Sequence, residues 1–325
     1  MKVAVDVTPL AQTRAGTARY LRALLPRVER DVRVERVHGF ARGRAGTLWL
    51  DLAWYPHVLP LRARGADVLH CTTYRGPVHA RTPLVVTVHD VAVFRHPDAF
   101  PRWTREYSRR VVPRVLRAAR LVLAVSEFTA GELEAVLGIP REKIRVVPNA
   151  VDAVFTSDGP RAGGDYVLAV GTLEPRKNLM RTIEAASRLG VELRVVGARG
   201  WGGVEARGGH VRWLGEVADD ELARQYRGAL CLAYPSLYEG FGIPVLEAMA
   251  CGTPVVTSSG GATAEVGSRA AVLIDPLDAS AIASGIERAI AERAALRVLG
   301  LERAREFSWD ESARLTVEAY TEAAA

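Results

Sequence analysis

Short runs of valine, leucine and isoleucine alternate along the chain with longer segments whose apolar residues recur at helical spacing. The short runs do not alternate apolar with polar residues, which is typical of parallel strands buried on both faces. Strands are predicted at Val3–Val7, Val32–Val37, Val68–Cys71, Leu84–Val88, Leu121–Val125, Ile144–Val147, Tyr166–Val170, Glu192–Val196, Val211–Leu214, Leu230–Tyr234, Pro254–Thr257 and Ala271–Ile274. Helices are predicted at Gly16–Val28, Arg102–Ala118, Ala130–Leu137, Asn178–Leu189, Asp219–Arg227, Pro244–Ala250, Ala279–Ala294 and Trp309–Ala324.

This order of elements predicts an α/β fold with two Rossmann-like domains. Repeated strand–helix–strand units imply right-handed crossovers and a doubly wound parallel sheet. The pattern restarts after the polar, glycine-rich stretch Ser157–Asp165, which is typical of a linker. The chain has 325 residues, which suits two domains of roughly 150 each. We therefore predict domains at residues 1–155 and 156–308, and ligands beyond the carboxyl ends of the strands.

Composition narrows the class of protein. Hydrophobic residues make up 49% of the chain and charged residues 25%, an ordinary globular balance. The three cysteines are far apart and lack metal-site spacing, which favours a reducing compartment over disulfides or zinc. The N-terminus lacks the apolar segment of a signal peptide, and no apolar run is long enough to span a membrane. We therefore expect a cytoplasmic protein.

The formal net charge of +6 suits an anionic ligand or an anionic membrane surface. Aromatic residues are not interleaved with the basic ones, and no nucleic-acid-binding module is recognisable, so no nucleic-acid partner is expected.

The densest chemical signal is YEGFGIPVLEAMACGTPVV, residues 238–256, which follows a predicted strand and opens a helix. Pro244 suits the first helical turn, because its missing N–H would lack a partner there in any case. Gly240 and Gly242 allow backbone to come close to a ligand. The amides of Gly242 and Ile243 would then point outward at the positive end of the helix dipole, where phosphate binds well.

Two carboxylates flank this predicted phosphate site, Glu239 just before the helix and Glu247 within it. Carboxylate oxygens accept hydrogen bonds from sugar hydroxyls. Each residue also has a simpler interpretation, since Glu239 could cap the helix and Glu247 could face solvent. Together with the phosphate site, they favour recognition of hydroxyl groups.

This stretch resembles the retaining GT-B glycosyltransferases of family 4, also called glycosyltransferase group 1, a mannosyltransferase-like group. The Glu-x7-Glu signature at Glu239 and Glu247 carries the resemblance. It extends over most of the chain through VTVHD (86–90), VSEFTA (125–130), VVPNAVD (146–152), AVGTLEPRKN (169–178), GEVADDELARQYRGA (215–229) and FSWDESA (307–313). The resemblance implies two domains facing a central cleft, with the first domain binding the acceptor and the second the donor. It also implies that the C-terminal helix 309–325 packs back on the first domain.

The resemblance implies roles for individual residues. Glu247 would bind the donor ribose, Glu239 would hold hydroxyls of the transferred sugar, and His89 would contact that sugar near the reacting centre. The implied catalytic residues are His89, Glu239, Arg176 and Lys177. The implied donor-binding residues are Gly16, Gly171, Arg176, Lys177, Val217, Glu239, Gly240, Phe241, Gly242, Ile243 and Glu247.

The implied chemistry follows from these roles. Arg176 and Lys177 would neutralise the pyrophosphate, because fixed cations stabilise a leaving group that develops negative charge. Backbone near Val217 would bind the base, and the loop Arg14–Tyr20 would approach the phosphates through Gly16. Ala18 stands where many relatives have a second glycine in that loop. The simpler interpretations are a solvated Arg176–Lys177 pair and a His89 that only satisfies backbone groups.

The implied reaction is transfer of a sugar with retention of anomeric configuration, with no metal and no cofactor beyond the nucleotide-diphosphate sugar. GDP-mannose is the favoured donor, UDP-sugars come next, and the acceptor would be a glycan or a lipid-linked molecule of unknown identity. No Asp-x-Asp motif occurs, and Asp219 and Asp220 are expected near a helix start. The alternatives are an inactive nucleotide-sugar-binding regulatory or scaffold subunit, or a different GT-B enzyme such as a sugar epimerase or a phosphorylase.

Residues 102–120 carry arginines at helical intervals: Arg102, Arg105, Arg109, Arg110, Arg114, Arg117 and Arg120. Tyr107, Val111 and Val115 would form the opposite side of the helix, and Pro113 would kink it. The simpler interpretation is a solvated face. The functional one is contact with anionic lipid at the inner face of a membrane, which would suit a lipid-linked acceptor.

Overall fold

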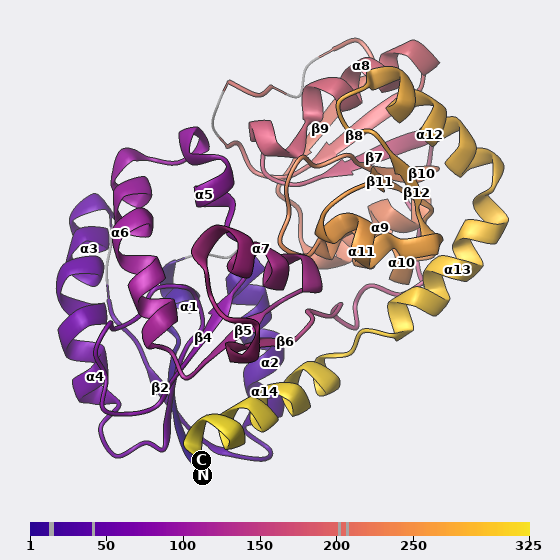
Figure 1. Cartoon of the computed structure of the whole chain (residues 1–325). Helices are drawn as coiled ribbons and strands as arrows, with labels where there is room; N and C mark the ends of the chain where they lie inside the picture. The colour runs from indigo at the N-terminus through magenta and orange to yellow at the C-terminus, as the bar shows by residue number, and fades with distance from the viewer. Residues whose placement is uncertain (13–15, 41–42, 201–202, 206–207) are drawn as a thin grey trace. The chain divides into compact units, whose positions relative to one another are not determined.

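The computed structural model describes residues 1–12, 16–40, 43–200, 203–205 and 208–325 (Figure 1). The chain divides into two compact units. Unit 1 contains Met1–Asn149 and Trp309–Ala325, and unit 2 contains Ala150–Ser308. The boundary predicted after residue 155 lies a few residues beyond the one in the structure. Among the described residues, no helix is both long enough and apolar enough to cross a membrane.

Unit 1 is built on a six-stranded parallel sheet with the strand order β2-β1-β3-β4-β5-β6. Its strands are β1 Lys2–Asp6, β2 Arg33–Val37, β3 Val68–Cys71, β4 Leu84–Val88, β5 Leu121–Ala124 and β6 Ile144–Val146. Every residue of β3, β4 and β5 is buried, as the unbroken apolar runs predicted. The edge strand β2 buries only Val37 fully. The strand order reverses between β1 and β3, so this is where the sheet favours ligand binding.

The helices of unit 1 include segments that the sequence did not predict, the longest of them at residues 43–62. They are α1 Thr8–Gln12, α2 Gly16–Val28, α3 Gly43–Trp49, the π-helix η1 Leu50–Val58, α4 Leu59–Arg62, α5 Ala92–Arg95, the 3-10 turns η2 Pro97–Ala99 and η3 Arg141–Lys143, α6 Arg102–Ala118, α7 Glu127–Leu137 and α14 Trp309–Ala324. Pro56 and Pro60 argue against a helix at residues 43–62, because proline lacks an N–H. A π-helical pattern, with Leu59 N–H donating to Trp54 O, carries the helix past Pro56. Ser126 caps α7, accepting a hydrogen bond from Thr129 N at 3.0 Å.

The C-terminal helix α14 packs against α2, β3 and β4 of unit 1, and Figure 1 shows it in yellow beside the indigo α2. His70 on β3 lies 2.6 Å from the Tyr320 hydroxyl of α14 and 2.8 Å from Thr87 Oγ1 of β4. Burial, and after it the charge of His89, lowers the pKa of His70 to about 3, so its ring is neutral. His70 therefore joins α14 to the sheet, which is a structural role.

Unit 2 is also built on a six-stranded parallel sheet, with the order β12-β11-β10-β7-β8-β9. Its strands are β7 Tyr166–Val170, β8 Glu192–Val196, β9 Val211–Gly215, β10 Cys231–Tyr234, β11 Val255–Ser258 and β12 Val272–Ile274. This is the strand order of dinucleotide-binding folds, and it reverses between β7 and β10. The carboxyl ends of these two strands are therefore the expected place for a ligand.

The helices of unit 2 surround this sheet on both faces. They are the 3-10 turn η4 Pro175–Lys177, α8 Leu179–Leu189, α9 Asp219–Gly228, α10 Ile243–Ala250, α11 Ala262–Gly267, the 3-10 turn η5 Ser268–Ala270, α12 Ala279–Ala291 and α13 Arg293–Arg305. The helix predicted at Ala279–Ala294 ends earlier, and α13, which was not predicted, begins two residues later. Helix α13 packs on α10 and buries only Leu296, Gly300 and Ala304, too few apolar positions for a clear periodic signal.

Candidate functional site

Two loops meet at the point where the strand order of unit 2 reverses. One follows β7 and ends at Asn178, and the other follows β10 and ends at Gly242. Leu237 N donates to Arg176 O at 2.8 Å, and Asn178 Nδ2 donates to Pro235 O at 3.0 Å. Because each loop is held by the other, their side chains have fixed positions relative to one another.

The Glu239 carboxylate lies at the centre of these loops and binds both predicted cations. Lys177 Nζ lies 2.6 Å from Glu239 Oε1, and Arg176 Nη1 lies 3.0 Å from Oε2. The hydroxyls of Ser236 and Tyr234 also donate to Oε1, at 2.7 and 2.8 Å. The structure therefore brings Glu239, Arg176 and Lys177 together, and neither cation is a solvated surface residue.

The surroundings of Glu239 keep it ionised. Burial by itself raises the pKa of a carboxyl group, but the charges of Lys177 and Arg176 and the hydrogen bonds from Lys177 and Ser236 act in the opposite direction. Together they lower the pKa of Glu239 from 4.5 to about 2. Arg176 also donates to Glu174 Oε1 at 2.6 Å and to the Tyr238 carbonyl at 2.6 Å. The site is thus a preformed ionic network with its charges nearly balanced.

The glycine-rich start of α10 has the backbone that the signature predicts. Gly242 has φ of +106°, and a Cβ there would come within 3.0 Å of Thr263 Cγ2, so glycine suits both its conformation and its space. Gly240 is buried and Ile243 half-buried beside it. Phe241 is buried and packs edge-on against Phe307, with ring centroids 5.7 Å apart. The Phe241 side chain is therefore unavailable to a ligand, which could contact only the backbone of this residue.

Gly171, at the end of β7, has φ of +138° and lies close to the Lys177 side chain. The loop after β8 lies directly against Gly171, since a Cβ on Gly197 would come within 1.9 Å of the Gly171 carbonyl oxygen. Gly197 was not identified from the sequence, although a glycine directly after a buried strand was a usable signal. These two glycines allow the loops after β7 and β8 to touch.

Glu247 is buried within α10, with 1% of its surface exposed, so the interpretation of a solvent-facing helix residue is wrong. Its Oε2 accepts a hydrogen bond from the Tyr226 hydroxyl of α9 at 2.9 Å. Tyr226 packs edge-on against Phe155, with ring centroids 6.0 Å apart. The structure therefore ties Glu247 to α9, the helix of the segment predicted to bind the base.

The remaining predicted donor residues lie in exposed or half-exposed positions. Val217 is half-buried in the turn between β9 and α9, and Asp219 and Asp220 lie in the first turn of α9, as expected. Gly16 is exposed at the first position of α2 in unit 1. Arg14 and Ala15 of the predicted phosphate loop lie outside the described residues.

His89 lies in unit 1, directly after β4, and lines a cavity of about 310 Å³. Pro9, Thr73, Tyr74, Arg75 and Asp90 line the same cavity, from the ends of β1, β3 and β4. These are the carboxyl ends of strands on both sides of the reversal in strand order. The cavity therefore occupies the position where an α/β sheet binds its ligands.

The imidazole of His89 is half-buried and held in one orientation. Its Nε2 lies 3.1 Å from the Thr72 carbonyl oxygen, so Nε2 carries the proton, and the Tyr20 ring packs edge-on with centroids 4.9 Å apart. Burial lowers the pKa of His89 below 6.5, although the Thr72 hydrogen bond and the charge of Asp90 oppose that change. His89 does satisfy a backbone group, and as a neutral ring it also presents Nδ1 as an acceptor.

Several residues of the Glu239 network were not identified from the sequence. They are Glu174, Asn178, Tyr234 and Ser236. Their position at the ends of β7 and β10 was a usable signal, but their residue types occur at many strand ends. In the described part of the chain, no group of three or more His, Cys, Asp or Glu side chains is placed to hold a metal ion.

The chain is similar to known proteins over nearly all of its length. Residues 153–307 match the family described as "Glycosyl transferases group 1", and residues 4–155 match "Glycosyltransferase Family 4". O-antigen chain mannosyltransferase B of Escherichia coli is 33% identical over 76% of this chain and 73% of its own. O-antigen chain mannosyltransferase RfbU of Salmonella typhimurium is 31% identical over 73% of this chain and 70% of its own.

Solved structures agree on the fold. The sucrose-phosphate synthase of Thermosynechococcus elongatus superposes with a TM-score of 0.77 at 21% identity, covering 99% of this chain and 98% of its own. Anabaena HepE, solved in complex with UDP and glucose, superposes with a TM-score of 0.75 at 20% identity, covering 99% of both chains. The two parallel six-stranded sheets, the family matches and the relatives agree, and the chain belongs to the family 4, group 1 glycosyltransferases of the GT-B fold.

Proposed function

We propose that this glycosyltransferase transfers mannose from GDP-mannose to an acceptor hydroxyl with retention of anomeric configuration. The observation that carries the proposal is the Glu239 network, in which an ionised carboxylate lies between two fixed cations. The names of the two enterobacterial relatives, both O-antigen chain mannosyltransferases, favour mannose and the synthesis of a glycan. Unit 2 would be the donor domain and unit 1 the acceptor domain.

Arg176 and Lys177 would bind the donor pyrophosphate and stabilise the charge of the leaving nucleotide diphosphate. Both cations already lie in fixed positions, so they need little reorganisation when that charge develops. Glu239 would accept hydrogen bonds from hydroxyls of the transferred sugar, because its low pKa keeps it an acceptor at neutral pH. Since the cations supply the positive charge, we propose that the reaction needs neither a metal nor a cofactor.

The rest of the donor would lie along α10 and α9. The backbone amides of Gly242 and Ile243, at the start of α10, would bind phosphate oxygens. Glu247, oriented by Tyr226, would bind the ribose, and the backbone at Val217 would bind the base. Gly16, Gly171, Gly240 and the backbone of Phe241 would permit close approach of the phosphates.

The acceptor would enter the 310 Å³ cavity of unit 1, whose tyrosines, arginine and Asp90 suit a polar, hydroxyl-rich molecule. His89 would contact the transferred sugar from this cavity. The three cysteines are buried and free, which supports a reducing compartment such as the cytoplasm.

The test is a donor screen with catalytic variants. We expect GDP-mannose to raise the melting temperature more than UDP-, ADP- or dTDP-sugars, since a ligand that binds only the folded state stabilises it. With glycan and lipid-linked acceptors, the wild type should release GDP, and Glu239→Ala should abolish release. Glu287→Ala, an exposed position on α12, is the matched control. Stabilisation by GDP-mannose without turnover on any acceptor would instead identify a nucleotide-sugar-binding regulatory or scaffold subunit.

We also propose that α6 contacts anionic lipid. Its buried side is formed by Tyr107, Ser108, Val112, Val115 and Leu116, which makes Val112 and not Val111 the central apolar position. All the arginines of residues 102–120 are exposed except the half-buried Arg105, and Arg109 and Arg110 share one acid, Glu106. Flotation with anionic vesicles at low salt should recover the protein, and Arg109→Ala with Arg110→Ala should reduce recovery. No recovery of the wild type would exclude lipid contact.

A further inference from the structure

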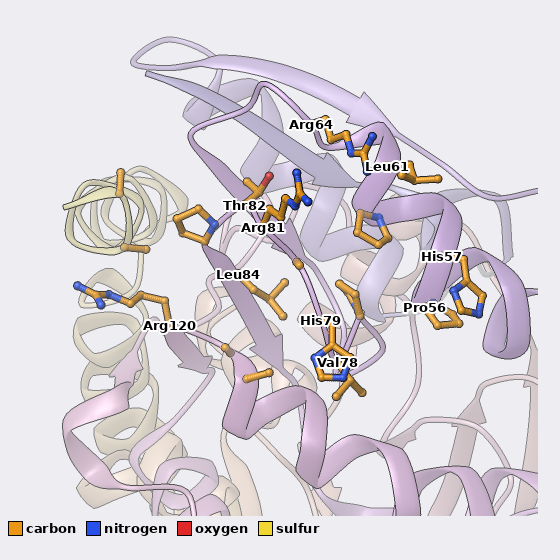
Figure 2. A pocket seen from close by; sticks show the side chains of 18 of the residues that line it. Pro56, His57, Leu61, Arg64, Val78, His79, Arg81, Thr82, Leu84 and Arg120 are labelled. Carbon is orange, nitrogen blue, oxygen red and sulfur yellow. The ribbon is translucent and has the colours of Figure 1, made fainter.

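A second cavity of unit 1, of about 940 Å³, shares no lining residue with the cavity that contains His89. It is lined by residues that precede β4, β5 and β6, among them Arg81, Arg120 and Lys143, and by Pro56, Arg64 and their neighbours near α4 (Figure 2). The last three residues of the chain, 323–325, complete the lining. It therefore lies at the amino ends of these strands, whereas His89 follows the carboxyl end of β4. We call it the amino-end pocket.

Positive charge dominates this pocket. Arg64, Arg81, Arg120 and Lys143 line it together with two histidines, His57 and His79. No lining residue is aspartate or glutamate, but Ala325 also lines the pocket and carries the carboxylate at the end of the chain. Figure 2 shows Arg64, Arg81 and Arg120 around the cavity, each from a different segment of the chain. Four cations gathered in a concave surface against a single carboxylate attract an anion.

The arginines of the pocket differ from most others in unit 1. Arg75, Arg95 and Arg145 pair with Asp51, Glu132 and Glu322. Over the part of the chain that the structure describes, the side chains of Arg64, Arg81 and Arg120 form no ion pair and no hydrogen bond. Their donors are therefore available to a ligand, and guanidinium groups match the geometry of phosphate oxygens.

The walls of the pocket are stiff. Pro56, Pro60, Pro77 and Pro83 line it, and proline fixes its own backbone torsion. Lys143 is held at the edge because its Nζ donates to the Arg117 and Ala119 carbonyls, at 2.8 and 3.2 Å. A ligand would therefore meet a largely preformed cavity, whose volume falls in the usual range for small-molecule sites.

We propose that the amino-end pocket binds a phosphate-bearing ligand, separately from the donor site. The ligand is either a soluble phosphate ester or the headgroup of an anionic lipid, since both present the same oxygens to Arg64, Arg81 and Arg120. Binding there does not depend on the Glu239 network, because that network lies in unit 2 and the pocket in unit 1.

The test is calorimetric titration of the full chain with inorganic pyrophosphate at low salt. The pocket variant is Arg64→Ala with Arg81→Ala, and the donor-site variant is Lys177→Ala. Arg22→Ala with Arg33→Ala is the matched control, since these arginines are also exposed, lie in unit 1 and do not line the pocket. All four proteins are compared by melting temperature to exclude unfolding.

We expect the pocket variant to weaken one binding event about tenfold or more, since it loses two charged donors. That event should persist in the matched control and in Lys177→Ala, which separates the result from any failure of the proposed donor site. The affinity should also fall with added salt. Pyrophosphate binding that is the same in the wild type and the pocket variant would overturn the proposal.

Vesicles distinguish the two sources of phosphate. Flotation uses phosphatidylcholine vesicles with and without phosphatidylglycerol, and α6 is intact in the pocket variant. A lipid headgroup would be identified if the pocket variant no longer floats with the anionic vesicles and if excess pyrophosphate prevents the wild type from floating. Equal flotation of both proteins, with pyrophosphate binding lost only in the pocket variant, would identify a soluble ligand.

Discussion

The Glu239→Gln substitution tests whether the ionic network exists as the structure shows it. Glutamine keeps the shape of the side chain and mimics the protonated carboxyl, but it removes the charge that Lys177 and Arg176 face. The folded state then keeps two cations with less compensation. We expect the variant to fold with a lower free energy of unfolding at neutral pH.

The magnitude follows from the pKa of Glu239. A decrease from 4.5 to about 2 corresponds to roughly 3 kcal/mol of stability, at about 1.4 kcal/mol per pKa unit. Because the pKa is lower in the folded state, this stability is fully present above pH 4.5 and is lost as the pH falls towards 2. At pH 3 the ionised carboxylate contributes only about 1 kcal/mol.

Scanning calorimetry of the full chain measures this difference. At pH 7 the loss of roughly 3 kcal/mol should lower the melting temperature of unit 2 by about 6–12 °C, given its size. At pH 3 the gap between wild type and variant should shrink to about a third. Glu287→Gln, an exposed change on α12, should leave the melting temperature nearly unchanged at both pH values.

Two results would refute this reasoning. If wild type and Glu239→Gln differ in stability by the same amount at pH 7 and pH 3, the charge of Glu239 is not the source of that stability. If their free energies of unfolding differ by less than about 1 kcal/mol at pH 7, water already satisfies the carboxylate and both cations.

Three further substitutions test other parts of the site. Gly242→Ala places a Cβ at φ of +106° against Thr263, and should lower stability by about 1–3 kcal/mol and reduce turnover, both measurable on one preparation. Tyr226→Phe removes the hydroxyl that donates to buried Glu247, so it should cost roughly 1–3 kcal/mol by urea unfolding and raise the donor KM. His89→Ala should lower kcat more than it lowers the donor-induced shift in melting temperature, because His89 would contact only the transferred sugar of the donor; complete loss of that shift with little change in kcat would contradict this role.

The fold was largely predictable because parallel strands buried on both faces leave unbroken apolar runs. All the strands of both sheets lie within a residue or two of the predicted ranges. The segment at residues 43–62 could not be predicted, since the π-helix around Pro56 does not follow the spacing of about 3.6 residues by which α-helices are recognised. Helix α13 was not predicted, because small residues such as Gly300 contribute to its contact with α10 and give little periodic signal.

The candidate site was predictable where residue type and spacing specify chemistry. The Glu-x7-Glu signature and the Arg–Lys pair lie at the carboxyl ends of β7 and β10, where the strand order predicts a ligand. The mutual pairing of Glu239 with Arg176 and Lys177 was not predictable, because it depends on how two loops distant in sequence dock. The contact between Tyr226 and Glu247 depends likewise on the packing of α9 against α10.

The assignment of α14 to unit 1 has a consequence for folding during synthesis. All of unit 2 leaves the ribosome before residues 309–325, so a continuous stretch of chain can form its sheet early. Until the last helix is synthesised, the first 149 residues lack the Tyr320 hydroxyl that contacts His70 on β3. A nascent chain arrested before residue 309 should therefore resist protease over unit 2 and be cleaved readily within the earlier residues.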